Sequence, residues 1–376
     1  MQTKGTGAST LLDALYILQE LLDGPRSYWA LLRASPRHAA AFVADLRHLL
    51  QEGLVAHAGS HLWLTEDGRA LAARHGLRAR QDVTCPACRG RGIVATGELR
   101  AVLERLRAVR RRAPEPLACF DQGAVTPEVS VLRVAWMHRQ GDLAGRALLL
   151  LGDDDLTSVA AALSGLPQRI HVLEADERLV RFLTDVARAE GWEGYLSVEP
   201  YDVRDGLPER LQGRFDVFLT DPVETLKGIR LFLSRATEAL REGGVGYFGL
   251  TRLESSLAKW REIQRSLLEM GYAITAILPQ FQEYELEHVL DSGWRVVTEA
   301  PVPVEEPDVL FYTSSLVRVQ LVGAPQPAVT GPVLMGDELY VDDEAYVTAP
   351  QAGERPEPRV EPGASPRRPR PSFNGR

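Results

Sequence analysis

The sequence predicts an α/β fold, in which a small winged-helix-like domain precedes a Rossmann-like, doubly wound sheet. Two observations predict the sheet. Strand-like and helix-like apolar patterns alternate from residue 147 to about residue 321, and the apolar run ALLLL stops at Gly152, as a buried first strand would. A third observation predicts the domain before it, because helical patterns followed by a hairpin pattern occupy the first 80 residues.

The chain divides into five expected segments. They are a winged-helix-like domain (1–80), a CxxC segment with a basic helix and a linker (81–128), a Rossmann-like domain (129–325), an acidic C-terminal flap (326–350) and a disordered tail (351–376). The tail is rich in Pro, Arg and Gly, a composition that buries too little apolar surface to fold. Five acids of the flap are expected to gather and cover a cationic ligand: Asp337, Glu338, Asp342, Asp343 and Glu344.

Composition and charge favour a soluble cytoplasmic enzyme. The net charge of −8 argues against a generalised nucleic-acid binder. No apolar run is long enough to span a membrane, and the first ten residues lack the apolar core of a signal peptide. Three cysteines do not make a disulfide scaffold, which favours a reducing compartment. Asn374 is the only asparagine, a scarcity that fits a thermophile.

The elements of the N-terminal domain follow from apolar spacing and turn residues. Residues 11–22 give one leucine-rich helix face that ends at Gly24, a short helix surrounds Trp29, and Ser35 starts a third. Residues 54–64 are expected to form a hairpin with Gly59 at its tip. DNA binding through the third helix is the minor interpretation, because its charges are few: Arg37, Arg47 and His38 against Asp45. A structural or dimerisation role is favoured.

The segment after this domain reads CPACRGRG from Cys85 to Gly92. A CxxC supplies two of the four ligands of a tetrahedral zinc site, while Cys119 is distant and there is no second CxxC. Two chains could pool their pairs in a dimer, or the segment is a turn with two free thiols. Glu98–Arg112 is then expected to form a basic helix, whose charged face is solvated or, in the minor interpretation, contacts RNA or an acidic partner.

Seven strands are expected in the Rossmann-like domain: Ala147–Leu151, Ile170–Leu173, Leu196–Glu199, Phe215–Leu219, Val245–Thr251, Tyr272–Leu278 and Leu316–Leu321. A helix at Val129–Arg139 leads into them, and four further segments carry helical spacing: Leu156–Leu163, Glu177–Glu190, Leu226–Leu240 and Ser256–Met270. This alternation predicts a mostly parallel sheet with helices on both faces.

The turn after the first strand is acidic. A turn at this position is usually glycine-rich, but here Asp153, Asp154 and Asp155 follow Gly152. Three carboxylates at the start of a helix repel anions, so the site is expected to take a positively charged cofactor, a positively charged substrate or a metal. An ordinary acidic helix cap is the alternative.

Acids also follow the next three strands, at the edge where ligands of such sheets bind. Glu174 lies 22 residues past Gly152, where an acid normally binds the ribose hydroxyls of an adenosyl cofactor. Asp202 lies where an acid meets the adenine amino group, and Asp221 and Glu224 follow the fourth strand. Each acid could merely cap a helix. Together they indicate an adenosyl-sulfonium transferase of the class I methyltransferase type.

Asp221-Pro222 resembles the [ND]PP[YF] motif of enzymes that alkylate amino nitrogens. In that motif the Asp or Asn oxygen accepts a hydrogen bond from the nucleophilic amine. Val223 and Glu224 stand here in place of a proline and of the aromatic ring that stacks on a flipped base. A carboxylate at the latter position suits an aliphatic ammonium group.

The chain resembles the branched-chain polyamine synthases, on the segments GDDDLTS, TDPVET and CPACRGRG after a winged-helix-like domain. The resemblance extends to about Ala345, and the chain departs from the family where DPVET lacks a second proline. It implies an N4-bis(aminopropyl)spermidine synthase. Such an aminopropyltransferase moves the aminopropyl group of decarboxylated S-adenosylmethionine to the internal amine of spermidine, then to N4-aminopropylspermidine, and releases methylthioadenosine.

The motifs and the resemblance together assign the site. Donor-binding residues are expected to be Gly152, Asp153, Asp154, Glu174 and Asp202; acceptor-binding residues are expected to be Asp155, Asp221 and Glu224. Asp155 and Asp221 are the expected catalytic residues, with Asp155 aimed into the pocket to receive the proton of the amine. No metal is expected to be required, and the expected assembly is a homodimer without membrane or nucleic-acid partners. The alternatives are an S-adenosylmethionine-dependent amino-methyltransferase acting on nucleic acid, and a winged-helix regulator that responds to polyamines.

Overall fold

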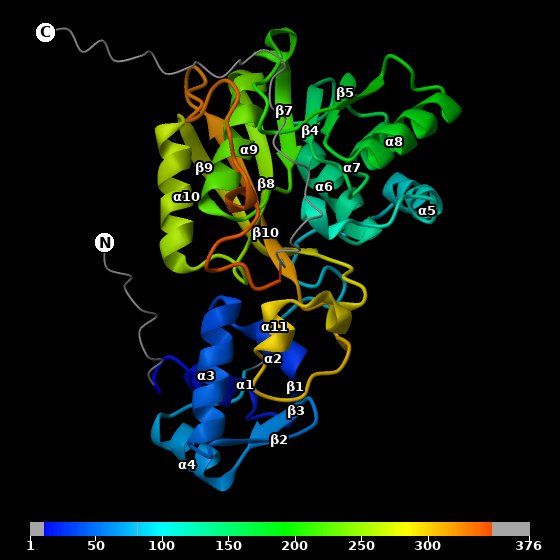
Figure 1. The fold of residues 1–376 in the computed structure, drawn as a ribbon. Helices are drawn as coiled ribbons and strands as arrows, with labels where there is room; N and C mark the ends of the chain where they lie inside the picture. The colour runs from blue at the N-terminus through cyan, green and yellow to red at the C-terminus, as the bar shows by residue number, and fades with distance from the viewer. Residues whose placement is uncertain (1–10, 81, 348–376) are drawn as a thin grey trace, which may run out of the picture.

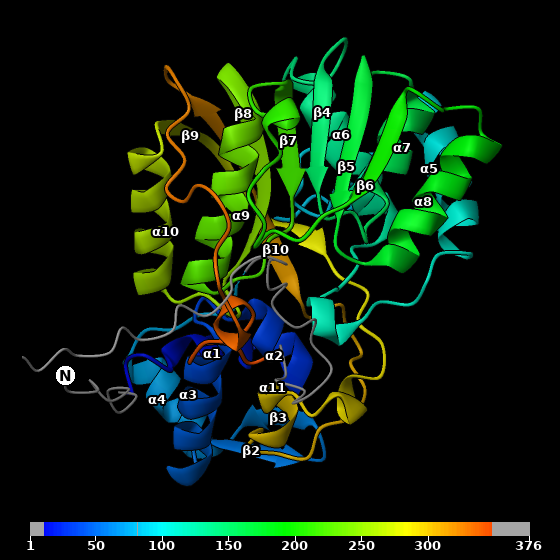
Figure 2. The same ribbon diagram turned by 45° about the horizontal axis from the view of Figure 1, so that its top comes forward.

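The structure, a computed structural model, describes residues 11–80 and 82–347. A seven-stranded sheet with helices on both faces forms the larger part, and a smaller unit of helices and a three-stranded sheet lies beyond the carboxyl ends of its parallel strands (Figures 1 and 2). The expected disordered tail and the last three residues of the expected flap (348–350) lie outside the described residues.

The strands of the large sheet lie where the sequence predicts them. They are β4 (Ala147–Leu151), β5 (Arg169–Glu174), β6 (Leu196–Pro200), β7 (Phe215–Thr220), β8 (Leu240–Thr251), β9 (Tyr272–Glu283) and β10 (Thr313–Leu321). Their order is β6-β5-β4-β7-β8-β10-β9. Strand β10 runs antiparallel to both of its neighbours, β8 and β9, and the other neighbouring pairs are parallel. The mostly parallel, doubly wound sheet is therefore confirmed. The strand order reverses between β4 and β7, where such sheets open a crevice for ligands.

Helices cover both faces of this sheet. One face carries α5 (Glu98–Arg110), α6 (Pro127–Arg139), α7 (Thr157–Ser164) and α8 (Glu177–Ala189), and the other carries α9 (Leu226–Ala239) and α10 (Leu257–Glu269). Strand β4 is buried along its whole length. Its residues alternate between the faces: Leu148 and Leu150 pack with the first group of helices, Leu149 and Leu151 with the second.

The smaller unit contains α1 (Leu15–Glu20), β1 (Arg26–Ser27), α2 (Tyr28–Ala34), α3 (Ala39–Gln51), β2 (Val55–Ala58), β3 (His61–Leu64) and α4 (Glu66–Arg74). Strands β2 and β3 form a hairpin around Gly59, and β1 pairs with β3. The winged-helix classification stays a prediction. Two basic residues near α3 are engaged within the chain: Arg37 pairs with Asp45 (3.2 Å), and Arg47 donates to the carbonyl of Glu299 (2.9 Å).

A segment between two strands of the large sheet completes the hydrophobic core of the smaller unit. Between β9 and β10 the chain leaves the sheet, and residues 286–312 pack on the smaller unit. The rings of Trp29 and Phe311 lie 4.4 Å apart between centroids, and the Tyr28 hydroxyl donates to the carbonyl of Val296 (2.8 Å). Apolar side chains from before the expected domain boundary at residue 80 therefore pack against apolar side chains of residues 286–312.

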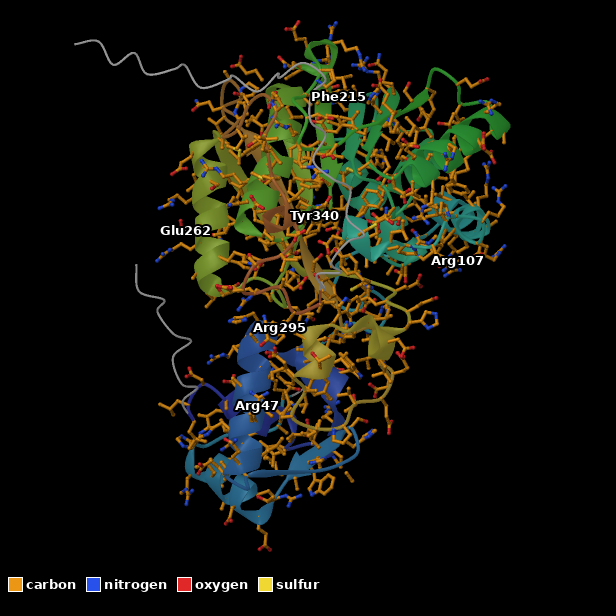
Figure 3. All side chains as sticks on the ribbon, in the orientation of Figure 1. Arg47, Arg107, Phe215, Glu262, Arg295 and Tyr340 are labelled. Carbon is orange, nitrogen blue, oxygen red and sulfur yellow. The ribbon has the colours of Figure 1, made fainter. Side chains whose placement is uncertain are left out.

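Short helical segments lie outside the layers: η1 (Ala118–Phe120), η2 (Glu209–Leu211), η3 (Val289–Ser292), α11 (Arg295–Thr298) and η4 (Asp337–Leu339). The basic helix α5 turns Arg107 outward (Figure 3), where it pairs with Glu104 (2.7 Å). Within residues 11–80 and 82–347, every helix is too short or too polar to cross a bilayer.

Candidate active site

The acidic turn after β4 is tied to the neighbouring strand. Gly152 has a φ of 79°, which a glycine adopts without strain. Its amide donates to the carbonyl of Leu173 (2.8 Å), and the amide of Asp153 donates to the carboxylate of Glu174 (2.9 Å). The turn and the acid at the end of β5 are therefore held together.

Asp153 caps the helix that follows. Its carboxylate accepts a hydrogen bond from the amide of Ser158 (3.1 Å) and one from the Ser158 hydroxyl. Its side chain is buried, and burial raises the pKa of Asp153 to about 8. Asp153 thus supports the start of α7 rather than facing open space.

Asp155 is turned away from the cavities. It accepts from the amide of Val125 (2.6 Å) and forms an ion pair with Arg133, whose side chain is only 1% exposed. The expectation that Asp155 points into the pocket is wrong. The buried guanidinium of Arg133 needs carboxylate partners, and Asp155 is one of them.

Asp154 is the aspartate that faces open space. Its carbonyl accepts from Arg110 (2.7 Å), while its carboxylate has no hydrogen-bond partner among the described residues. Burial, together with the nearby Asp155 and Glu174 carboxylates, raises the pKa of Asp154 well above its usual value. An unsatisfied carboxylate in such a place favours a cationic ligand.

Two adjoining cavities open at the carboxyl ends of the parallel strands. The β5 cavity has about 630 Å³ of open space and contains Gly152, Glu174 and Asp202 in its wall. The β8 cavity, at the ends of β7, β8 and β9, has about 590 Å³. Four residues line both cavities and form their common wall: Asp121, Gln122, Asp154 and Asp221.

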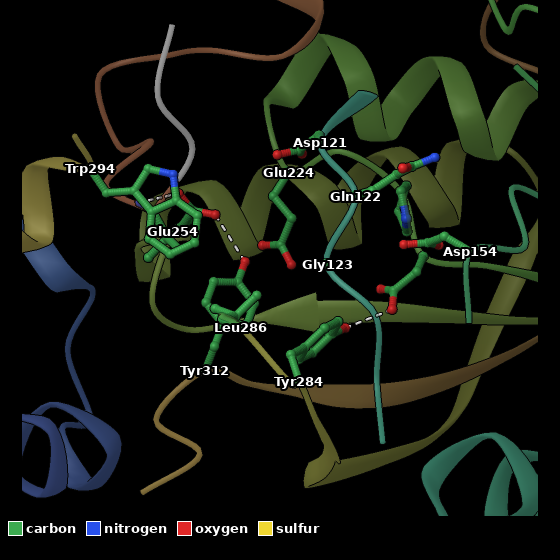
Figure 4. A pocket seen from close by; sticks show the side chains of 13 residues that line it. Asp121, Gln122, Gly123, Asp154, Glu224, Glu254, Tyr284, Leu286, Trp294 and Tyr312 are labelled. Carbon is green, nitrogen blue, oxygen red and sulfur yellow. Dashed lines mark hydrogen bonds between the residues drawn. The ribbon is translucent and has the colours of Figure 1, made fainter. Parts of the chain in front are cut away.

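The β8 cavity is strongly acidic. Among residues 11–80 and 82–347, five carboxylates and no lysine or arginine line it: Asp121, Asp154, Asp221, Glu224 and Glu254. Aromatic side chains complete the wall: Tyr284, Trp294 and Tyr312 (Figure 4). Burial raises the pKa of Glu224 well above its usual value, with the Glu254 carboxylate adding to the shift. A polycation would relieve this concentration of negative charge.

Asp221 is held by a buried polar network. Its carboxylate accepts from the Arg133 guanidinium (2.7 Å) and from the Tyr284 hydroxyl (2.7 Å; Figure 4). Arg133 also donates to the side-chain carbonyl of Gln282 (2.5 Å). Gly249 on β8 leaves room for Asp221, because a Cβ there would lie 1.9 Å from the carboxylate. Burial raises the pKa of Asp221 to about 6, although Arg133 opposes the shift.

The β5 cavity places two further acids at the ends of successive strands. Glu174 accepts from the amides of Asp153 and Asp176 (2.9 Å each). Asp202 accepts from the Arg204 guanidinium (2.6 Å). Both acids therefore have fixed positions in the wall, and no lysine or arginine in the described part of the chain lines this cavity.

A family model described as the branched-chain polyamine synthase A C-terminal domain matches residues 101–347. The N(4)-bis(aminopropyl)spermidine synthase of Thermococcus kodakarensis is 40% identical over 324 residues, which cover 85% of this chain and 90% of that protein. The protein of the same name from Thermus thermophilus is 41% identical over 305 residues, covering 80% and 84%.

The chain belongs to the branched-chain polyamine synthase family. A solved structure agrees. The branched-chain polyamine synthase from Thermus thermophilus, in complex with N4-aminopropylspermidine and 5′-methylthioadenosine, superimposes with a TM-score of 0.77 at 36% identity. The match covers 92% of this chain and 95% of that one.

In this chain, six of the eight site residues expected from the sequence line the cavities: Gly152, Asp154, Glu174, Asp202, Asp221 and Glu224. Asp153 and Asp155 do not line them, because one caps α7 and the other pairs with Arg133. The binding and catalytic roles of all eight stay predictions.

Other site residues escaped the sequence analysis: Asp121, Arg133, Glu254, Tyr284 and Tyr312. Glu254 carried a usable signal, since it follows the end of the fifth parallel strand, as the other acids follow theirs. Tyr284 follows β9, Tyr312 precedes β10, and Arg133 lies in a helix before the sheet. No motif spacing therefore marks these residues.

The expected acidic flap lies beside both cavities. Tyr340 lines the β5 cavity, and Val347 lines the β8 cavity. Its acids are partly engaged by lysines: Lys259 pairs with Asp342 (2.8 Å) and lies 3.7 Å from Glu344. That these acids gather a polycation stays a prediction.

Proposed function

We propose that this chain transfers the aminopropyl group of decarboxylated S-adenosylmethionine to the internal amine of spermidine, and then to N4-aminopropylspermidine. The products are branched polyamines and methylthioadenosine. The observation that carries this proposal is the β8 cavity, which five carboxylates and no cationic side chain line. The names of two relatives, and the two ligands bound by the solved relative, support the same reaction.

The donor is proposed to occupy the β5 cavity. Glu174 would accept hydrogen bonds from the ribose hydroxyls, and Asp202 would meet the adenine amino group. An ordinary methyl donor carries a carboxylate, but the decarboxylated donor carries only positive charge. A cavity wall without lysine or arginine suits the decarboxylated donor.

The acceptor is proposed to lie in the β8 cavity, with its internal nitrogen at the wall that Asp154 and Asp221 share between the cavities. The nitrogen lone pair attacks the aminopropyl carbon bonded to sulfur. The carbon–sulfur bond breaks, and its electron pair stays on sulfur, which leaves as the neutral thioether methylthioadenosine. A neutral leaving group needs no metal to stabilise it.

The nitrogen must lose a proton before it can attack. Asp154 is the proposed proton acceptor, because its carboxylate is unsatisfied and its pKa is raised. Asp221, which Arg133 and Tyr284 hold in place, would accept a hydrogen bond from the amine and orient the lone pair. Asp155 is a positioning residue in this scheme, because it acts on Asp221 through Arg133.

The test is a product analysis with each donor. Purified protein is incubated with spermidine and decarboxylated S-adenosylmethionine, and mass spectrometry should find one and then two added aminopropyl groups with an equal amount of methylthioadenosine. S-adenosylmethionine should bind about 2–4 kcal/mol more weakly, because its carboxylate would face the acidic wall. Methylated RNA formed from S-adenosylmethionine, without any aminopropylated product, would contradict the proposal.

A further inference from the structure

The CPACRGRG segment forms an ordered turn whose cysteines lie outside both cavities. The amide of Arg89 donates to the carbonyl of Cys85 (2.8 Å), and the amide of Arg91 donates to the carbonyl of Cys88 (2.9 Å), which closes the turn. Two cysteines at this spacing are the usual pair of ligands that one segment supplies to a tetrahedral zinc site.

The two glycines are required by this turn. Gly90 and Gly92 have φ values of 84° and 75°, in the left-handed region that disfavours other residues. The CxxCxGxG spacing therefore describes one local structure, a turn that carries both cysteines.

Buried and exposed arginines anchor the turn to the large sheet. Arg91 is 4% exposed; it donates to the carbonyl of Phe281 (2.7 Å) and forms an ion pair with Glu283. Arg89 reaches Glu283 as well (3.1 Å). The turn is thus held before any ligand arrives, so little ordering entropy opposes binding.

The pair of sulfurs is an incomplete site within one chain. Thiolate-bound zinc takes four ligands in a tetrahedron. Throughout residues 11–80 and 82–347, no group of three or more His, Cys, Asp or Glu side chains is placed to hold a metal. Cys85 is exposed to solvent, and Val83 beside it is 87% exposed, so both sulfur and apolar surface are accessible to another molecule.

We propose that two copies of this chain share one zinc ion, to which each copy contributes Cys85 and Cys88. Identical pairs from two chains meet naturally on a two-fold axis, with the metal on that axis. Four soft sulfur ligands select zinc over the hard cations that prefer oxygen. The role is structural, and it does not depend on the aminopropyl-transfer reaction.

Cobalt(II) is the probe, because its tetrahedral thiolate complexes absorb visible light. Reduced, metal-free full-length protein is titrated with Co²⁺ without oxygen. Thiolate-to-cobalt absorption should saturate at half a metal ion per chain, while sedimentation changes from monomer to dimer. Zn²⁺ should displace the cobalt, and removing the metal with a chelator should return the monomer.

The matched variants separate the CxxC pair from the third cysteine. The double variant Cys85→Ser/Cys88→Ser should lose the absorption and the metal-dependent dimer, whereas Cys119→Ser should keep both. Melting temperature checks that each variant is folded, and the chelator experiment on the unmodified chain tests the proposal without any substitution. Saturation at one metal per chain without dimerisation, absence of metal binding by the reduced chain, or a dimer that the chelator and the double variant leave intact would each overturn it.

Discussion

Asp153, Asp154 and Asp155 are consecutive, yet each carboxylate meets a different environment. Asp153 caps the start of α7, Asp155 pairs with Arg133, and Asp154 lines the wall between the two cavities. A change to asparagine keeps the size of the side chain and removes its charge. The same substitution should therefore have different effects at neighbouring positions.

Asp154→Asn should lower kcat by about 10²–10⁴-fold, since an amide cannot receive the proton of the attacking amine. Melting temperature should change little, because the Asp154 carboxylate has no hydrogen-bond partner among the described residues. Asp155→Asn is the matched control and should mainly destabilise the fold, by about 3 kcal/mol, because it leaves Arg133 short of a charge partner. Normal turnover by Asp154→Asn, measured beside Asp155→Asn, would show that another group accepts the proton.

The pH dependence should reveal Asp221. Its pKa is raised to about 6, so the side chain is protonated below that pH and ionised above it. Because the amine donates its hydrogen bond to the ionised Asp221 carboxylate, kcat/KM should rise as pH increases through about 6. In Asp221→Asn that limb should disappear, while the limb set by the amine of the substrate at higher pH remains. A limb near pH 6 that survives in Asp221→Asn would assign it to another group.

The carboxyl ends of the strands determine where these acids lie. The loops after β4, β5 and β7 deliver acids to one edge, because the carboxyl ends of parallel strands meet there. The loop after β8 adds Glu254, which does more than line a cavity. It accepts from the amides of Tyr346 (2.9 Å) and Val347 (2.8 Å), and from the Tyr312 hydroxyl (2.9 Å). Glu254 thereby fastens the last described residues of the flap over the β8 cavity.

Glu254→Gln should loosen this end of the flap. One oxygen becomes an amide nitrogen, which leaves a buried mismatch of about 1–3 kcal/mol. The KM for spermidine should rise about tenfold, while the Kd of the donor stays the same. Lys227→Met is the control, because its contact with Glu338 (3.8 Å) lies on the surface and contributes little. An unchanged KM in steady-state kinetics would show that the flap does not depend on Glu254.

At the scale of the whole molecule, the smaller unit and the large sheet should unfold together. Trp29, which is 1% exposed, packs on Phe311 and donates to the carbonyl of Glu305 (2.7 Å). Because residues 286–312 complete the core of the smaller unit, the smaller unit does not bury its apolar surface alone. The arrangement also brings the smaller unit to the edge of the sheet that carries the cavities (Figure 2).

Trp29→Ala should destabilise the whole chain by about 3–5 kcal/mol, the usual effect of removing a large buried aromatic side chain. Scanning calorimetry should find one transition in the unmodified chain and one transition at lower temperature in the variant. Donor binding, followed by fluorescence during the same melt, should be lost at that lower midpoint. A variant in which donor binding survives to the original midpoint would show that the large sheet folds independently.

The local sequence determined the strands and the acids that follow them. A run such as ALLLL is buried on both faces, as a central strand of a parallel sheet requires. The carboxyl ends of β4, β5, β6 and β7 then place Asp154, Glu174, Asp202 and Asp221 at one edge. The glycines of CPACRGRG likewise follow from the backbone of one turn. Spacing along the chain is sufficient for such features, because their cause is local.

Only the tertiary structure decided which carboxylates are neutralised and which face open space. Arg133, Tyr284 and Tyr312 come from segments far from the motifs, and their contacts give Asp155, Asp221 and Glu254 their separate environments. Arg133 pairs with the carboxylates that lie within its reach, and the packing of α6 against the sheet decides which carboxylates these are. Consecutive aspartates look equivalent in a sequence, and packing makes them different.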